Sequence, residues 1–333
     1  MASHQESSAT VEEEELLSAA LGQSVKILRR DRVQSLWAGY GSIDRLTLSG
    51  ANVPNTVVVK RVSAGRGDAA DISHQRKVRS YHVERAFYQN YSSRTTESCR
   101  VPRLLASSPP TSPNVVLVLE DLDAAGWAER RHSLGYEDAL ATVEWLADFH
   151  RTFLSEDASD LWDQGSYWHL ATRPDEYEAM DDRDPLKANA AAIDGLLRDA
   201  THKTLLHGDA KLANFNFSSG GGGSSRGSGG EGGTPPVSAV DFQYIGAGPG
   251  VVDLAYLLSA FPAVDRYDSN EPRLVDAYFS RLGCGAEVES EWRALYPVAI
   301  ADFQRFLAGW GGGGWNRKGR TGEHCKKALE MCR

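Results

Sequence analysis

The sequence predicts a mixed α+β fold with two lobes. Residues 27–62 are typical of β-strands, because β-branched and apolar residues dominate there and a turn at 49–52 interrupts them. Beyond about residue 122, apolar residues recur at helical spacing instead. With 333 residues, 41% of them hydrophobic, the chain can bury two cores. The expected parts are a tail and leading helix at 1–25, an N-terminal lobe at 26–122 and a C-terminal lobe at 123–333.

Charge and cysteine content exclude several classes of protein. The chain has 36 Lys+Arg against 45 Asp+Glu, a net charge of −9, which argues against a nucleic-acid partner. It contains no run of about 18 apolar residues, so no membrane span is expected. The acidic, polar N-terminus lacks the features of a targeting signal, and we expect a cytoplasmic protein. Four cysteines show neither metal-ligand spacing nor a disulfide framework: Cys99, Cys284, Cys325 and Cys332. No oligomeric state is predicted.

One polar loop carries residues that suit phosphoryl transfer. The sequence LLHGDAKLANF at 205–215 brings Asp209, Lys211 and Asn214 onto one loop, and a predicted hairpin returns Asp241 to it. The reaction needs a carboxylate that orients the attacking hydroxyl and accepts its proton, a cation beside the phosphoryl group, and oxygen ligands for Mg²⁺. We assign the catalytic roles to Asp209 and Lys211, and the metal site to Asn214 with Asp241. The tripeptide His-Gly-Asp alone would also fit an ordinary turn.

This loop resembles the motifs of a known family. HGDxKxxN at 207–214 and DFQ at 241–243 look like those of the aminoglycoside phosphotransferase and choline kinase superfamily. The run GAGPGVVDLAYLL at 246–258 is most similar to its ecdysteroid-kinase-like branch, also called CHK kinase-like. The same loop spacing occurs in protein kinases, but His-Gly replaces His-Arg here, and no DFG or APE is present. The resemblance implies a bilobal kinase-like fold that uses ATP and Mg²⁺ to phosphorylate a small hydroxylated acceptor.

The predicted N-terminal sheet contains candidate nucleotide-binding residues. Gly39 and Gly41 lie between two strand-like segments, where small residues could let backbone N–H groups approach phosphates. A plain hairpin turn has the same composition. Lys60 ends the strand-like run VVVK, and the resemblance makes it the phosphate-binding lysine and makes Glu84, on a predicted helix at 72–91, its partner. The alternatives are a solvated lysine on a strand and a solvated glutamate on a helix.

Residues 115–122, VVLVLEDL, predict a buried strand that ends in two carboxylates. In the resembled family this is the hinge strand, whose backbone groups pair with adenine, so Glu120 and Leu122 become candidate cofactor-binding residues. A strand-end turn in which Glu120 and Asp121 cap a helix is the alternative.

The remaining segments are assigned structural roles. Residues 11–21 predict a packing helix behind a frayed tail, and 137–154 a core helix on which a structural His150 fits better than a ligand. The aromatic residues of 161–169 serve either lobe packing or an acceptor wall. Residues 218–236 are too rich in Gly and Ser to bury anything and predict a disordered insertion. We take His207 as structural.

Asp253 and the identity of the acceptor complete the interpretation. Asp253 lies in an apolar helix and must accept hydrogen bonds, and the resemblance implies that it supports the catalytic loop. Lys211 and Gln243 differ from the residues usual in aminoglycoside and choline kinases, respectively, which favours the ecdysteroid-kinase-like branch. A choline, ethanolamine or aminoglycoside kinase, a pseudokinase and a protein kinase stay as alternatives.

Overall fold

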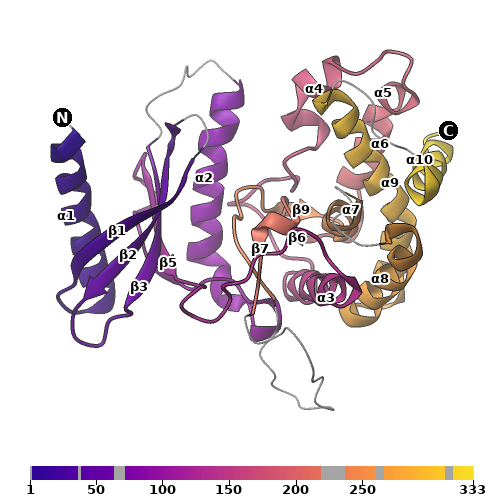
Figure 1. The fold of residues 1–333 in the computed structure, drawn as a ribbon. Helices are drawn as coiled ribbons and strands as arrows, with labels where there is room; N and C mark the ends of the chain where they lie inside the picture. Colours follow the sequence, from indigo (N-terminus) through magenta and orange to yellow (C-terminus); the bar gives the residue numbers. More distant parts are fainter. Residues whose placement is uncertain (1, 37–38, 64–71, 219–236, 260–265, 312–317) are drawn as a thin grey trace, which may run out of the picture. The chain divides into compact units, whose positions relative to one another are not determined.

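A computed structural model describes residues 2–36, 39–63, 72–218, 237–259, 266–311 and 318–333. The chain forms two compact units (Figure 1). The first consists of Met1–Arg94 and Val101–Ala128, and the second of Thr95–Arg100 and Glu129–Arg333. None of the helices in the described ranges is both long and apolar enough to cross a membrane.

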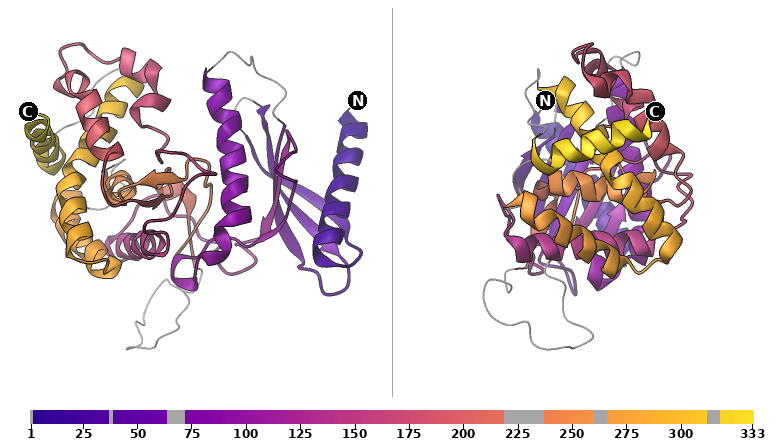
Figure 2. Two further views of the ribbon diagram at one scale, coloured as in Figure 1. Left: turned by 180° about the vertical axis from the view of Figure 1, so that it is seen from behind. Right: turned by 90° about the vertical axis from the view of Figure 1, so that its right-hand side faces the viewer.

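The first unit is built on a five-stranded antiparallel sheet with the order β1-β2-β3-β5-β4. One helix covers each face, α1 on one side and α2 on the other (Figures 1 and 2). The strands are β1 (Lys26–Ser35), β2 (Gly41–Ser49), β3 (Thr56–Val62), β4 (Leu104–Ser107) and β5 (Val115–Glu120), and the helices are α1 (Ala2–Leu21), α2 (Ile72–Asn90) and the 3-10 turn η2 (Ser92–Arg94).

Strand periodicity explains why both faces of this sheet are covered. Side chains alternate between the faces, so Val57 and Val59 of β3 lie on one face with Leu46 and Leu48 of β2, packed beside Leu17 of α1.

The leading helix begins at Ala2 rather than near residue 11, so the expected frayed tail is wrong for the described residues.

The second unit is mainly helical, with two small antiparallel sheets, β6–β9 and β7–β8. Its elements, several of them short, follow one another as η3 (Glu97–Cys99), α3 (Tyr136–Thr152), η4 (Leu170–Thr172), α4 (Pro174–Glu178), α5 (Pro185–Ala188), α6 (Ala190–Arg198), β6 (Thr204–Leu206), η5 (Leu212–Asn214), β7 (Phe215–Phe217), β8 (Val237–Ala239), β9 (Gly246–Gly248), α7 (Val251–Ser259), α8 (Tyr267–Leu282), α9 (Ala286–Trp310) and α10 (Gly319–Met331).

The two small sheets flank the segments predicted to be catalytic, at 207–214 and around Asp241. β6 runs into the HGD sequence and pairs with β9, and β7 pairs with β8 as the predicted hairpin. Of the predicted disordered insertion, residues 219–236 lie outside the described ranges. The C-terminal segment forms α10, which packs on α9 and which the sequence did not indicate.

Candidate active site

Asp209, Lys211 and Asn214 are in direct contact on the loop after β6. The buried Asp209 accepts hydrogen bonds at Oδ2 from Lys211 Nζ (2.8 Å) and from Asn214 Nδ2 (3.2 Å). Asn214 Nδ2 also donates to the Asp209 carbonyl at 2.8 Å. The structure therefore brings three of the predicted residues together, and it turns the nitrogen of the Asn214 amide toward Asp209.

The second carboxylate oxygen of Asp209 has a different environment. Within the described ranges, Oδ1 is buried and accepts no hydrogen bond, and the Tyr256 hydroxyl lies close enough to interact with this carboxylate. Such an oxygen is unusual in a folded protein and can accept a hydrogen bond from a water molecule or a bound ligand. Burial raises the pKa of the Asp209 carboxyl and the Asp241 carboxylate acts in the same direction, whereas Lys211 opposes both. A buried carboxylate with one unsatisfied oxygen is suited to accept a hydrogen bond from a bound hydroxyl.

Asp253 of α7 supports the loop that carries Asp209, as the resemblance implied. Its buried carboxylate accepts hydrogen bonds from the backbone N–H groups of His207 (2.6 Å) and Gly208 (3.0 Å). His150 Nε2 lies 3.1 Å from the same carboxylate, and His150 Nδ1 lies 2.7 Å from the Tyr278 hydroxyl. His150 is therefore a structural residue, as expected, and Asp253 joins α7 to α3, to α8 and to the loop.

His207 is also structural. Its ring is fully buried, and Nε2 donates to the Val240 carbonyl at 3.0 Å, which links the loop to the segment just before Asp241. The backbone N–H of Asp209 approaches His207 Nδ1 at 3.3 Å. Burial lowers the pKa of His207, so the neutral imidazole with its proton on Nε2 fits these contacts.

Asp241 is oriented by a residue for which the sequence predicted no role. Gln243 is buried, and its Nε2 donates to Asp241 Oδ1 at 2.7 Å. Asp241 itself has a φ of 71°, a left-handed conformation that is uncommon outside glycine. The sequence did contain a signal for this contact, because a glutamine two residues after an aspartate can donate a hydrogen bond to its carboxylate. In the described part of the chain, no group of three or more His, Cys, Asp or Glu side chains is placed to hold a metal ion.

In the first unit, Lys60 and Glu84 form a buried ion pair. Lys60 Nζ lies 2.6 Å from Glu84 Oε2, and both side chains are almost completely buried. The two solvated alternatives are therefore wrong. Lys60 also lies 5.7 Å from the centre of the Tyr81 ring on α2, so the lysine is held by one helix on one face of the sheet.

Gly39 lies in the connection between β1 and β2, and Gly41 is the first residue of β2. Gly39 has a φ of 73°, and a Cβ at Gly41 would collide with the Arg61 carbonyl of β3. Tyr40, between them, lies with its hydroxyl 2.5 Å from His74 Nδ1 on α2. A hairpin turn is thus sufficient to explain both glycines, and phosphate binding by this turn stays a prediction.

At the end of β5, two backbone groups of the predicted hinge already form hydrogen bonds with other residues of the chain. The N–H of Glu120 donates to the Arg103 carbonyl (2.9 Å), and the Leu122 carbonyl accepts from the Trp127 N–H (2.8 Å). Asp121 is buried and pairs with Arg45 of β2 at 2.7 Å. A turn follows the strand here, so there is no helix for Asp121 to cap.

Most aromatic residues of 161–169 serve packing. Trp168 is fully buried against Tyr256 of α7, with ring centres 4.6 Å apart. Tyr167 is partly exposed, and its hydroxyl lies 3.3 Å from that of Tyr256. Burial, and next the Asp209 carboxylate, raise the pKa of Tyr256. Both hydroxyls are therefore protonated and lie near Asp209. The sequence placed Tyr167 among residues that serve lobe packing or an acceptor wall, and it assigned Tyr256 no role.

Solved structures similar to this chain support the fold. The microcompartment-associated aminopropanol kinase is 15% identical with a TM-score of 0.50, over 93% of this chain and 90% of that chain. The amicoumacin kinase hAmiN in complex with AMP-PNP, Ca²⁺ and Ami is 13% identical with a TM-score of 0.53, over 99% and 95% of the two chains. These similarities confirm the predicted α+β kinase-like fold.

The sequence comparisons agree at the level of the family. No curated protein matches the chain significantly. Residues 50–298, about three quarters of the chain, match the model of the APH family, described as the phosphotransferase enzyme family. The predicted superfamily and the predicted class of enzyme are thereby confirmed. The chain belongs to the phosphotransferase enzyme family.

Proposed function

We propose that this phosphotransferase transfers the γ-phosphate of ATP to a hydroxyl group of a small molecule, with Asp209 as the base. The observation that carries the proposal is the buried Asp209 carboxylate, whose Oδ2 is held by Lys211 and Asn214 while Oδ1 accepts no hydrogen bond within the described ranges. Oδ1 is the atom to which an acceptor hydroxyl would donate. The raised pKa of Asp209 makes it a stronger proton acceptor than an ordinary carboxylate.

Asn214 and Asp241 suit a Mg²⁺ ion. Because the Asn214 nitrogen donates to Asp209, its amide oxygen points elsewhere, and Gln243 fixes the Asp241 carboxylate. One amide and one carboxylate, completed by phosphate oxygens and water, form the kind of oxygen donor set that Mg²⁺ prefers over an all-protein site. A bound Mg²⁺ would neutralise charge on the phosphates. Lys211 adds a second positive charge next to the base.

We assign nucleotide binding to Lys60, the Gly39–Gly41 turn and the end of β5. The Glu84 carboxylate pairs with Lys60 and fixes its direction, as a lysine that binds phosphate requires. Since the Glu120 N–H and the Leu122 carbonyl are hydrogen-bonded within the chain, the Leu122 N–H is our candidate donor to the adenine ring. Positioning and charge stabilisation would account for most of the rate enhancement.

The acceptor is proposed only as a class, a small hydroxylated metabolite. Tyr167 and Tyr256 present two hydroxyl groups near Asp209 and would orient the acceptor. The motifs at 241–258 favour the ecdysteroid-kinase-like branch, so alcohols of steroid type belong in a substrate panel beside amino alcohols and sugars.

Two alternatives are less well supported. A pseudokinase usually lacks one of the functional residues, whereas Lys60, Asp209, Asn214 and Asp241 are all present here. A protein kinase needs an activation segment after the metal-binding aspartate. Here only β9 and its flanking turns, within residues 242–250, separate Asp241 from α7.

The test is ATP consumption by the full-length protein with Mg²⁺ and a panel of hydroxylated metabolites, with a generic protein substrate as comparison. The matched control is Asp209→Asn, which keeps the size of the side chain but removes the base. Turnover of a small molecule that disappears in this variant supports the proposal. Turnover that persists in Asp209→Asn removes Asp209 from the base role, and phosphorylation of protein alone would favour the protein-kinase alternative.

A further inference from the structure

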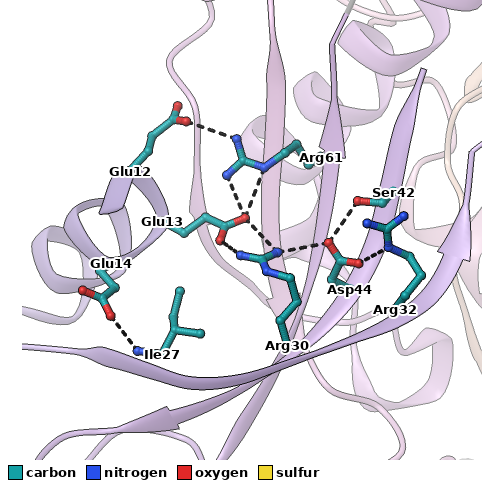
Figure 3. A network of polar contacts seen from close by, with 9 residues as sticks. All are labelled: Glu12, Glu13, Glu14, Ile27, Arg30, Arg32, Ser42, Asp44 and Arg61. Atoms are coloured by element: carbon teal, nitrogen blue, oxygen red, sulfur yellow. Dashed lines mark hydrogen bonds and ion pairs between the residues drawn. The ribbon is translucent and has the colours of Figure 1, made fainter. Parts of the chain in front are cut away.

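A network of charged side chains joins the leading helix to three strands of the sheet (Figure 3). Its centre is Glu13 of α1, which is fully buried. Glu13 pairs with Arg30 of β1, and its Oε1 lies 2.7 Å from Arg61 Nη2 of β3. Arg30 in turn lies 3.0 Å from Asp44 of β2, which also pairs with Arg32 and accepts from the Ser42 hydroxyl. One buried carboxylate therefore connects α1 to β1 and β3, the two strands that flank β2.

The network lies at one end of the contact between helix and sheet. The other end is apolar and contains Leu17 of α1 with Leu46 and Val57. In the register of β2 and β3, Ser42 faces Arg61 and Ile43 faces Lys60. The charged end is thus the end of the sheet that carries Lys60 and the glycine turn.

Alternation along β3 places Lys60 and Arg61 on opposite faces of the sheet. Lys60 points to α2, where it pairs with Glu84, and Arg61 points to α1, where it pairs with Glu13. Two adjacent residues of one strand are therefore held from opposite sides, each by a buried carboxylate from a different helix. Displacing β3 would have to break one of these two ion pairs.

We infer that Glu13 is a positioning residue for nucleotide binding, because it fixes the strand that carries Lys60. This inference rests on the nucleotide role proposed for Lys60. Oε1 of Glu13 lies within hydrogen-bond reach of both Arg30 Nη1 (3.5 Å) and Arg61 Nη2 (2.7 Å), so two guanidinium groups share it. Removing that negative charge leaves Arg30 paired with Asp44 and Arg61 paired with Glu12, but it removes the buried acceptor that joins both guanidinium groups to α1. β3 then loses its buried contact on the α1 face, so the position of Lys60 becomes less fixed.

The central variant is Glu13→Gln in the full-length protein. We expect its KM for ATP and its dissociation constant for a fluorescent ATP analogue to rise about tenfold, which corresponds to about 1.4 kcal/mol. The KM for the acceptor should not change. Hydrogen exchange of the β3 amides should accelerate, and this readout needs no nucleotide. Arg61→Met should also raise the KM for ATP. The double variant should raise it by less than the product of the two single fold-changes, because both variants remove the same Glu13–Arg61 contact.

Two matched controls separate positioning from general destabilisation. Glu15→Gln removes the same charge from an exposed position on the same helix and should leave both readouts unchanged. Leu17→Val weakens the apolar end of the contact, so it lowers the melting temperature with little effect on ATP affinity. The inference is overturned if Glu13→Gln changes neither β3 exchange nor ATP affinity, or if Leu17→Val weakens ATP binding as much. If the wild-type protein binds no ATP, the proposed nucleotide site is refuted instead. Hydrogen exchange of the β3 amides in Glu13→Gln would still test whether Glu13 fixes this strand.

Discussion

Replacing Asp253 by asparagine should loosen the catalytic loop and lower the stability of the second unit. The carboxylate accepts from the Gly208 N–H at Oδ1 (3.0 Å) and, at Oδ2, from the His207 N–H (2.6 Å), with His150 Nε2 at 3.1 Å. Asparagine has the same shape but only one acceptor oxygen. Its NH₂ group would have to face one of these donors, in a site where α7 is buried along almost its whole length.

The magnitude follows from the hydrogen bonds that are lost. A hydrogen bond to a charged group contributes about 1.5–3 kcal/mol, and leaving a buried donor unsatisfied adds about 1–3 kcal/mol. One bond is lost and the others become neutral, so we expect the free energy of unfolding to fall by about 3–5 kcal/mol. For a unit of this size, that loss lowers Tm by roughly 10 °C. Activity should fall as well, because His207 and Gly208 directly precede Asp209.

Scanning calorimetry of the full-length protein, combined with ATP consumption at a temperature where every variant is folded, measures both effects. Asp163→Asn is the matched control, since Asp163 is exposed and the same change of charge there should leave Tm within about 1 °C. If the Tm of Asp253→Asn equals that of Asp163→Asn, the reasoning that the buried carboxylate stabilises the loop is refuted. A large loss of stability with unchanged activity would show that the loop does not depend on it.

Three further predictions concern the proposed metal ligand Asp241, the glycine turn and pH. Gln243→Ala removes the donor that orients Asp241, so the Mg²⁺ concentration for half-maximal activity should rise by about tenfold, and an unchanged metal requirement contradicts this role. Gly41→Ala should lower the free energy of unfolding by about 1–3 kcal/mol in denaturant titrations because its Cβ would meet the Arg61 carbonyl, and a neutral outcome would mean that the turn can shift. Burial lowers the pKa of His207 from its usual 6.5, so the unfolded state binds the extra proton first and stability should decline as pH falls below about 6.5. His207→Gln should flatten the decline, and an equally steep profile would assign it to other groups.

Local sequence was sufficient to predict the contacts within the loop that carries Asp209. Asp209, Lys211 and Asn214 lie within six residues, so their mutual contact follows from the geometry of one short loop. The strands and the long helices were also predictable, because alternation and helical spacing are properties of consecutive residues. The expected helix at 72–91 corresponds to α2, and the one at 137–154 to α3.

Contacts between distant segments were not predictable in the same way. Local spacing could not tell whether Lys60 and Glu84 were solvated or paired, and burial in the folded unit decided for the ion pair. α10 was missed because its stability comes from outside its own sequence. It packs on α9, and His324 lies 2.9 Å from the buried Glu271 of α8.

The sequence by itself determined the enzyme class of this phosphotransferase, and it predicted a base, a lysine and oxygen ligands from their characteristic spacing. Only the tertiary structure decided which side chains hold these groups in place. Gln243 beside Asp241, Asp253 below the loop and Glu13 against Arg61 all depend on partners that the fold brings together. The physical reason is that residue types and their spacing encode local geometry, whereas burial and the pairing of buried charges are properties of the whole packed unit.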